Sequence, residues 1–161
     1  MMAIYIEYEG IKGNVTAAGY KNHIAVSSLV FGVLRGISME PGNMSNREAT
    51  CPSLSQITLK KTVDSSTVSF FKESVAGSVG KKVTIKFVHT GFDSLIEFMS
   101  YTLDDCLVRG YSVKINDQEE SQEILSLSFS KILLSHIDRD SANKSSAPVR
   151  VGYDLATAKS V

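Results

Sequence analysis

Residues 4–13 read IYIEYEGIKG, and residues 149–159 read VRVGYDLATAK. In the first stretch Ile4, Ile6 and Tyr8 alternate with Tyr5, Glu7 and Glu9, and in the second stretch Val149, Val151, Tyr153 and Leu155 alternate with smaller or charged residues. A two-residue period of this kind is typical of half-buried β-strands. We therefore expect a β-rich domain in which both ends of the sequence are held in sheet.

The composition of the chain is typical of a folded globular domain and argues against several other classes of protein. The chain has 161 residues, of which 43% are hydrophobic and 21% charged, a size and balance typical of one folded domain over residues 1–161. No apolar run approaches the ~20 residues that a membrane-spanning helix needs. The 17 basic and 17 acidic residues give a formal net charge of zero, whereas nucleic acids and anionic membranes select a strongly positive face. We expect no nucleic-acid partner and no membrane insertion.

The first residues do not resemble a cleavable export signal. No basic flank leads into an apolar core, and Glu7 and Glu9 interrupt the only candidate segment. We therefore expect that any export of this chain uses a route other than a cleavable signal peptide.

The middle of the sequence predicts further strands. Residues 24–34 are predicted to form one long strand with apolar residues on both faces, which either lies centrally between layers or meets a second subunit. Residues 54–63, 82–89, 95–115 and 123–137 follow as β regions. Asp104 and Asp105 are expected to divide 95–115 into two strands, and the loss of alternation at 132–134 suggests a bulge or a doubly buried strand end. About eight strands favour a closed or two-sheet β-barrel over an open sheet.

One helix is predicted, over about residues 66–76. Residues 64–67 supply side-chain oxygens suited to a helix start, and Val68, Phe71 and Val75 follow at the spacing of an amphipathic helix. Gly77 stands where a helix end with positive φ is expected.

The segment 35–53 breaks the strand pattern and is predicted to be a long extended loop. It contains glycines, prolines and asparagines together with Ile37, Met39 and Met44. It could be a plain surface loop. Alternatively, its apolar side chains are contact residues on a projecting loop, because exposed apolar groups placed together mark partner surfaces.

The sequence contains no convincing catalytic or metal-binding motif. His23, His89 and His136 are isolated in the sequence, and Cys51 and Cys106 lack metal-like spacing. We expect reduced thiols, with Cys106 as a buried residue rather than a nucleophile. The sequence predicts no enzyme, no cofactor and no metal site.

The order of several short motifs resembles the haemolysin-coregulated proteins of bacterial type VI secretion, the Hcp family. The match extends over nearly the whole chain. It is carried by the segments Glu9–Gly13, Ile24–Gly32, Thr58–Asp64 and Gly152–Asp154, arranged around the helix at 66–76. The loop at 35–53 departs from the family because it lacks the glycine-dense run that many members have.

The resemblance implies a mostly β fold: a closed β-barrel of two packed antiparallel sheets with one short α-helix and a long extended loop. It implies a homohexamer whose rings stack into the inner tube of the type VI secretion system. Its partners would be other copies of itself, a contractile sheath, a trimeric spike protein and small effector proteins in the lumen. The protein would assemble in the bacterial cytoplasm and then be secreted.

On this hypothesis the candidate contacts between subunits or rings are Ile37, Met39, Met44 and Arg47. Two other readings remain open. The first is a monomeric β-barrel that binds a small ligand at its mouth. The second is a hydrolase that uses Cys106 or a serine together with one of the histidines.

Overall fold

The computed structural model describes residues 1–37, 39, 41–42, 51–91, 94–139 and 146–161. It is mostly β, with one helix among the described residues, α1 (Thr67–Ala76). The strands are β1 (Met2–Tyr8), β2 (Ile24–Val26), β3 (Ser28–Val30), β4 (Val33–Leu34), β5 (Ser53–Leu54), β6 (Ile57–Lys61), β7 (Lys81–Thr90), β8 (Leu95–Lys114), β9 (Gln122–Ser128), β10 (Lys131–His136), β11 (Val149–Asp154) and β12 (Lys159–Ser160).

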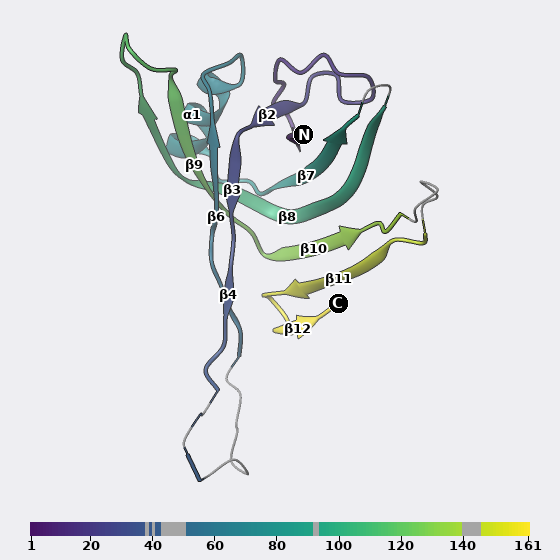
Figure 1. The fold of residues 1–161 in the computed structure, drawn as a ribbon. Coiled ribbons are helices and arrows are strands. Elements are labelled where there is room, and N and C mark those ends of the chain that lie inside the picture. Colours follow the sequence, from purple (N-terminus) through teal and green to yellow (C-terminus); the bar gives the residue numbers. More distant parts are fainter. Residues whose placement is uncertain (38, 40, 43–50, 92–93, 140–145) are drawn as a thin grey trace.

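The strands pair antiparallel in two sheets that share β8 (Figure 1). One sheet has the order β12-β11-β10-β8-β7-β1-β2, and the other joins β3, β6, β9 and the second half of β8. The expected division at Asp104 and Asp105 is wrong, because β8 continues through both residues. Asp105 instead has a positive φ of 55° at the point where β8 leaves β7 and begins to pair with β9.

The stretch 24–34 also passes from one sheet to the other. β2 pairs with β1, β3 pairs with β6, and between them the Ser27 N–H donates to the Lys60 carbonyl at 2.7 Å. The prediction of one long strand is therefore wrong, and so is a central position between two layers for its second half; a contact of its apolar residues with a second subunit stays a prediction. Ile24 and Val26 are buried, whereas Val30 is 65% exposed, because the chain leaves the body of the molecule beyond that point.

The core lies between the two sheets. Alternate residues of β1, β6, β7 and β9 face inward, and Phe70 of α1 closes one end of the core with an edge-to-face contact to Tyr8. The apolar side chains with 1% exposure or less are Ile6, Ile24, Ile57, Leu59, Phe70, Val83, Ile85, Val88, Leu103, Cys106, Leu125 and Leu127.

The side of helix α1 that packs on the core is opposite to the side that the sequence predicts. Val68, Phe71 and Val75 are 54–78% exposed, and Phe70 is the buried residue of the helix. Gly77 has φ −69°, so the expected positive φ is wrong. A side chain there would instead meet the Glu73 carbonyl, since an added Cβ would lie 2.5 Å from that oxygen.

The last third of the chain differs from expectation in two places. The alternation of β9 ends because a turn at 129–130 leads into a separate strand, β10, so no bulge or doubly buried end is needed to explain 132–134. β11 is not half-buried: Val149 and Val151 are 64% and 59% exposed. The buried residue of this strand is Gly152, because β11 packs close to β10 there.

Candidate functional site

The most distinctive feature of the molecule is a long hairpin that projects from the barrel-like body (Figure 1). One arm runs through β3 and β4, and the other returns through β5 and β6. Pairing continues beyond the body, because Val33 and Leu34 lie opposite Leu54 and Ser53. The segment predicted as a loop at 35–53 is therefore carried on a β-paired stem, of which only Ser53 lies within the predicted loop.

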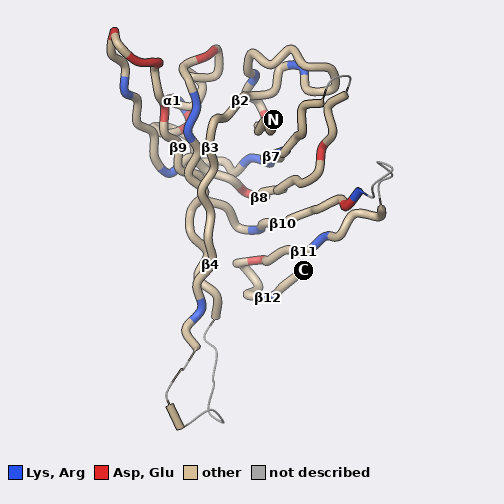
Figure 2. The backbone as a smooth tube through the Cα atoms, viewed as in Figure 1, with Lys and Arg blue, Asp and Glu red and all other residues tan. Residues whose placement is uncertain are grey.

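The described part of this hairpin is apolar and exposed. Val30 is 65% exposed, Val33 53%, Leu34 80% and Met39 84%. Arg35 is the only charged residue among the described residues between Ser28 and Ile57, and Figure 2 shows correspondingly little charge along the stem. Exposed apolar side chains gathered on one element are typical of protein-binding surfaces.

Two of the four predicted contact residues lie on this surface. Met39 is strongly exposed, and Ile37 is 37% exposed. Met44 and Arg47 lie outside the described residues. The role of all four as contacts stays a prediction.

Sequence reasoning missed Val30, Val33 and Leu34. They belong to the apolar run 24–34, whose apolar residues on both faces predict either a central strand between layers or a contact with a second subunit. The signal that could have found them is Gly32, which interrupts the β-branched run at the place where the chain leaves the body.

The base of the hairpin is anchored in the body. Phe31 makes aromatic contacts with Tyr101 and Phe129 at centroid distances of 6.2 and 6.1 Å. Across the stem, the Ser55 N–H donates to the Gly32 carbonyl at 2.9 Å, and the Gly32 N–H donates to Ser55 Oγ at 2.9 Å. These contacts fix the direction in which the exposed part leaves the body.

The inner end of the hairpin's return strand carries a buried ionic cluster. Lys61, the last residue of β6, and Glu123 of β9 both have fully buried side chains, and Lys61 Nζ lies 3.1 Å from Glu123 Oε1. Nζ also donates to Asp64 Oδ1 and to the Thr62 carbonyl, each at 3.0 Å. All three ammonium donors therefore have partners, which is what makes a buried lysine tolerable.

The same cluster fixes the start of α1. Asp64 accepts hydrogen bonds from the Ser66 N–H and hydroxyl, and the Thr67 hydroxyl donates to Glu123 Oε1. Glu123 also affects Tyr111: burial raises the pKa of the Tyr111 hydroxyl, and the nearby carboxylate raises it further. The cluster thus ties the hairpin strand, the helix and β8–β9 together at one point. The burial of Lys61 was not predicted from the sequence.

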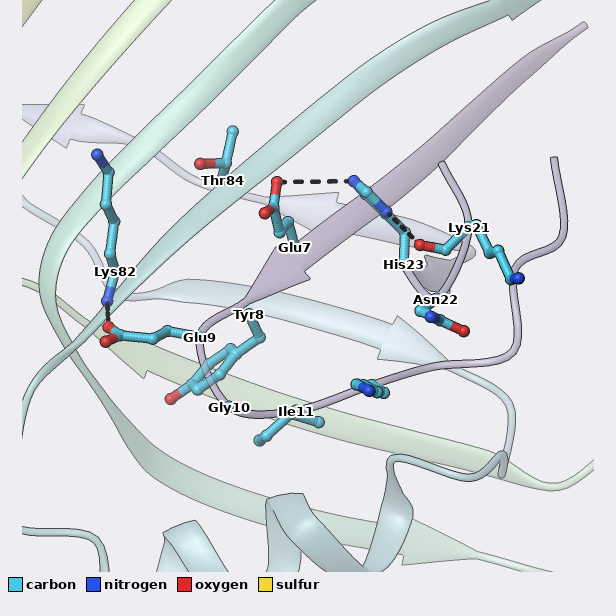
Figure 3. A pocket seen from close by; sticks show the side chains of 11 residues that line it. Glu7, Tyr8, Glu9, Gly10, Ile11, Lys21, Asn22, His23, Lys82 and Thr84 are labelled. Atoms are coloured by element: carbon cyan, nitrogen blue, oxygen red, sulfur yellow. Dashed lines mark hydrogen bonds and ion pairs between the residues drawn. The ribbon is translucent and has the colours of Figure 1, made fainter. Parts of the chain in front are cut away.

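A surface hollow of about 670 Å³ lies at the end of β1 (Figure 3). Polar and apolar atoms share its walls about equally, and several of its lining residues are charged: Glu7 lies 3.8 Å from His23 Nε2, and Glu9 accepts from the Lys82 N–H at 2.9 Å. Small-ligand sites usually have mainly apolar walls with a few polar groups. Charged side chains make up more of this lining than such sites usually have, so the hollow does not by itself favour a small-ligand binding module.

The described cysteines differ in environment. Burial raises the pKa of the Cys106 thiol to about 12, so it stays protonated at neutral pH and is a poor nucleophile. Cys51 is exposed near the hairpin stem.

The described residues contain no group of three or more His, Cys, Asp or Glu side chains placed to hold a metal ion. Within the described part of the chain, no helix is long and apolar enough to cross a membrane.

Comparison with known proteins places this architecture in a family. Residues 5–136 match the model of the family described as type VI secretion system effector, Hcp. No curated protein matches the sequence.

Solved structures match the fold over the whole chain. One, described as a type six secretion system protein, has a TM-score of 0.91 at 18% identity, with both chains covered completely. An Hcp protein from Salmonella typhimurium gives 0.78 at 19% identity, with 99% of each chain covered. A chain in the baseplate of the anti-feeding prophage gives 0.53 at 14% identity, covering 83% of this chain and 91% of that one. At these identities the likeness shows a shared fold.

Proposed function

Because the chain belongs to the Hcp family of type VI secretion system effectors, we propose that it is a structural subunit of the secretion system's inner tube. In this role it forms hexameric rings that stack into a conduit and are themselves exported. The role requires no catalysis and no cofactor, and it is performed by one domain spanning residues 1–161.

The observation that carries the proposal is the projecting hairpin. A monomer gains nothing from placing Val33, Leu34 and Met39 in water, since each exposed apolar side chain forgoes about 1.5–3 kcal/mol that burial would supply. A ring closes by heterologous contacts, so each subunit needs two different surfaces outside its own core. The hairpin supplies one such surface, and Ile37, Met39, Met44 and Arg47 are the proposed contacts on it.

The finer parts of the proposal concern closure and partners. We propose that the barrel closes at Ser27, where β2 passes into β3 and the Ser27 N–H bonds to Lys60. The stacked rings would be enclosed by a contractile sheath and tipped by a trimeric spike protein, with small effector proteins carried in the lumen. Assembly would take place in the bacterial cytoplasm, and export would occur without a cleavable signal peptide.

Negative-stain electron microscopy of the purified protein tests the proposal. We expect rings with a central hole, and light scattering on the same sample should give six times the 17.5 kDa mass of one chain. Particles without a hole, together with the mass of a single chain at micromolar concentration, would contradict it.

A further inference from the structure

The hollow at the end of β1 is lined by lysines from three separate segments of the chain. Lys12 follows β1, Lys21 precedes β2, and Lys82 lies in β7. All three are exposed, and their ammonium groups make no ion pair within the described part of the chain. The volume of about 670 Å³ lies within the range of about 300–1,000 Å³ that is usual for small-ligand sites.

The segments before and after the β1–β2 loop are held against each other. The Gly13 N–H donates to the Asn22 carbonyl at 2.9 Å, which joins the segment of Lys12 to that of Lys21. The two segments are in close contact, because an added Cβ at Gly13 would lie 2.4 Å from the His23 carbonyl oxygen. The backbone positions of two of the lysines are therefore fixed relative to each other.

The carboxylates of the hollow are engaged by groups of the chain itself. The Glu9 side chain accepts from the Lys82 N–H at 2.9 Å, and the Glu9 N–H donates to the Lys82 carbonyl at 3.2 Å, which joins β7 to the end of β1. Glu7 Oε2 lies 3.3 Å from Nζ of Lys86, a lysine that is not part of the lining. Lys86 therefore balances the charge of Glu7, and Glu9 is the carboxylate without a cationic partner.

His23 adds no charge to the hollow. Its Nδ1 lies 3.3 Å from the Lys21 carbonyl oxygen, and its Nε2 lies 3.2 Å from Lys86 Nζ. A carbonyl oxygen can only accept a hydrogen bond and an ammonium group can only donate one, so Nδ1 carries the ring proton and Nε2 accepts. The imidazole is neutral in this arrangement. Three lysines are thus balanced only by the carboxylate of Glu9.

An excess of positive charge around a hollow attracts anions that carry several charges. Figure 3 shows Lys21 and His23 on one side of the hollow and Glu9 and Lys82 on the other, with the turn at Gly10 between them. The space within 4 Å of an added Cβ at Gly10 is empty, so a ligand can approach the backbone there. Lysine binds phosphate as a compact point charge with three donors, and a diphosphate has enough charged oxygens to reach several lysines at once.

We propose that this hollow binds the diphosphate group of a small molecule, with Lys12, Lys21 and Lys82 as the binding residues. The half-buried Thr84 in the wall offers a hydroxyl that can donate to a phosphate oxygen. The inference goes beyond the proposed tube function and does not depend on ring formation.

Isothermal titration calorimetry of the full chain at neutral pH and low salt tests the site, with inorganic pyrophosphate and a nucleoside diphosphate as probes. We expect saturable binding of one ligand per chain that weakens as salt is added, because the contacts join charged groups. Lys21→Gln and Lys82→Gln should each lower the affinity by roughly tenfold, since each removes one charge-assisted contact. Lys159→Gln is the matched control, because this exposed lysine lies in β12 at the opposite edge of the sheet from β2, and it should change the affinity by less than about twofold.

A variant of the acidic wall gives a change in the other direction. Glu9→Gln removes the uncompensated negative charge and keeps a side-chain oxygen that can accept from the Lys82 N–H. It should raise the affinity for pyrophosphate severalfold, because the anion is then no longer repelled. A lower affinity in Glu9→Gln would contradict this assignment of the charges.

The remaining outcomes separate the ligand from general attraction between charges. The absence of saturable binding with both probes overturns the proposal. Equal losses of affinity in Lys159→Gln and in the two lining variants overturn it as well, and so does sulfate binding as tight as that of pyrophosphate. Equal affinities for the two probes would assign recognition to the diphosphate alone, whereas clearly tighter binding of the nucleoside diphosphate would add the nucleoside to the ligand.

Discussion

Strand β1 and the outer stem of the hairpin are both rich in apolar residues, but they meet different surroundings. β1 lies between β2 and β7, and its Ile6 is 1% exposed. In β4, Val33 and Leu34 pair only with the returning arm and are 53% and 80% exposed. The difference teaches that apolar residues in this chain are placed in two ways: those of the body are buried and hold one chain together, and those of the hairpin are exposed, as the proposed contact with another chain requires.

The largest effect is expected inside the body, at Lys61, where β6, the strand that continues the hairpin's return arm, meets β9. Lys61→Met leaves the Glu123 carboxylate buried without its ammonium partner and should lower the free energy of unfolding by about 3–5 kcal/mol. Lys60→Met is the matched control, since the neighbouring lysine is exposed and should change stability by less than about 0.5 kcal/mol. Chemical denaturation measures both, and equal effects of the two variants would show that the cluster does not join the regions.

Truncating one leucine in each region tests the comparison itself. Leu59→Ala in the core should cost about 2–5 kcal/mol because it leaves a cavity between the sheets. Leu34→Ala in the hairpin should cost less than about 0.5 kcal/mol when unfolding is measured at low protein concentration. A large loss from Leu34→Ala would mean that the hairpin packs on its own body.

Replacing one glycine in each region should give a smaller difference in stability between the body and the hairpin. At Gly152 an added Cβ would lie 2.3 Å from the Ile132 carbonyl oxygen, so Gly152→Ala should cost about 1–3 kcal/mol by forcing β11 away from β10. At Gly32 the space within 4 Å of an added Cβ is empty, so Gly32→Ala should be nearly neutral. Thermal unfolding of the two variants measures the difference between their losses of stability. Equal losses would show that β11 is held on β10 as loosely as the hairpin is held on the body.

The two cysteines distinguish the regions without changing the fold. At pH 8 an alkylating reagent should modify Cys51, which is exposed near the hairpin stem, and leave Cys106 unmodified until the protein unfolds. Burial raises the pKa of Cys106 to about 12, so its protonated thiol persists well above the usual thiol range. Intact-mass measurement after alkylation should find one adduct in the native protein and two after denaturation. Two adducts under native conditions would contradict the burial of Cys106.

The parts of the fold that could be predicted from the sequence are those governed by local pattern. The alternation of β1, β7 and β9 identifies which side chains are buried, and residues 64–67 mark the start of α1. Periodicity does not say what an apolar face will meet. For that reason the exposed side of α1 and the exposed valines of β11 were interpreted as typical packing faces.

The candidate site was predicted only in outline. The composition of 35–53 left open a plain surface loop or a projecting loop of contact residues, and the β-paired stem that carries it depends on the long-range pairing of β4 with β5. The ionic cluster could not be predicted either. Lys61 and Glu123 are 62 residues apart, and they meet only because β6 pairs with β9.

The central claim is that the hairpin's exposed apolar residues are covered by other copies of the chain. Sedimentation velocity of the native protein and of a Leu34→Asp, Met39→Asp double variant tests it directly. We expect the native protein to sediment as six-chain particles and larger multiples, and the folded variant to lose the larger multiples. A native protein that remains a single chain at micromolar concentration, or a variant that assembles as the native protein does, would contradict the account.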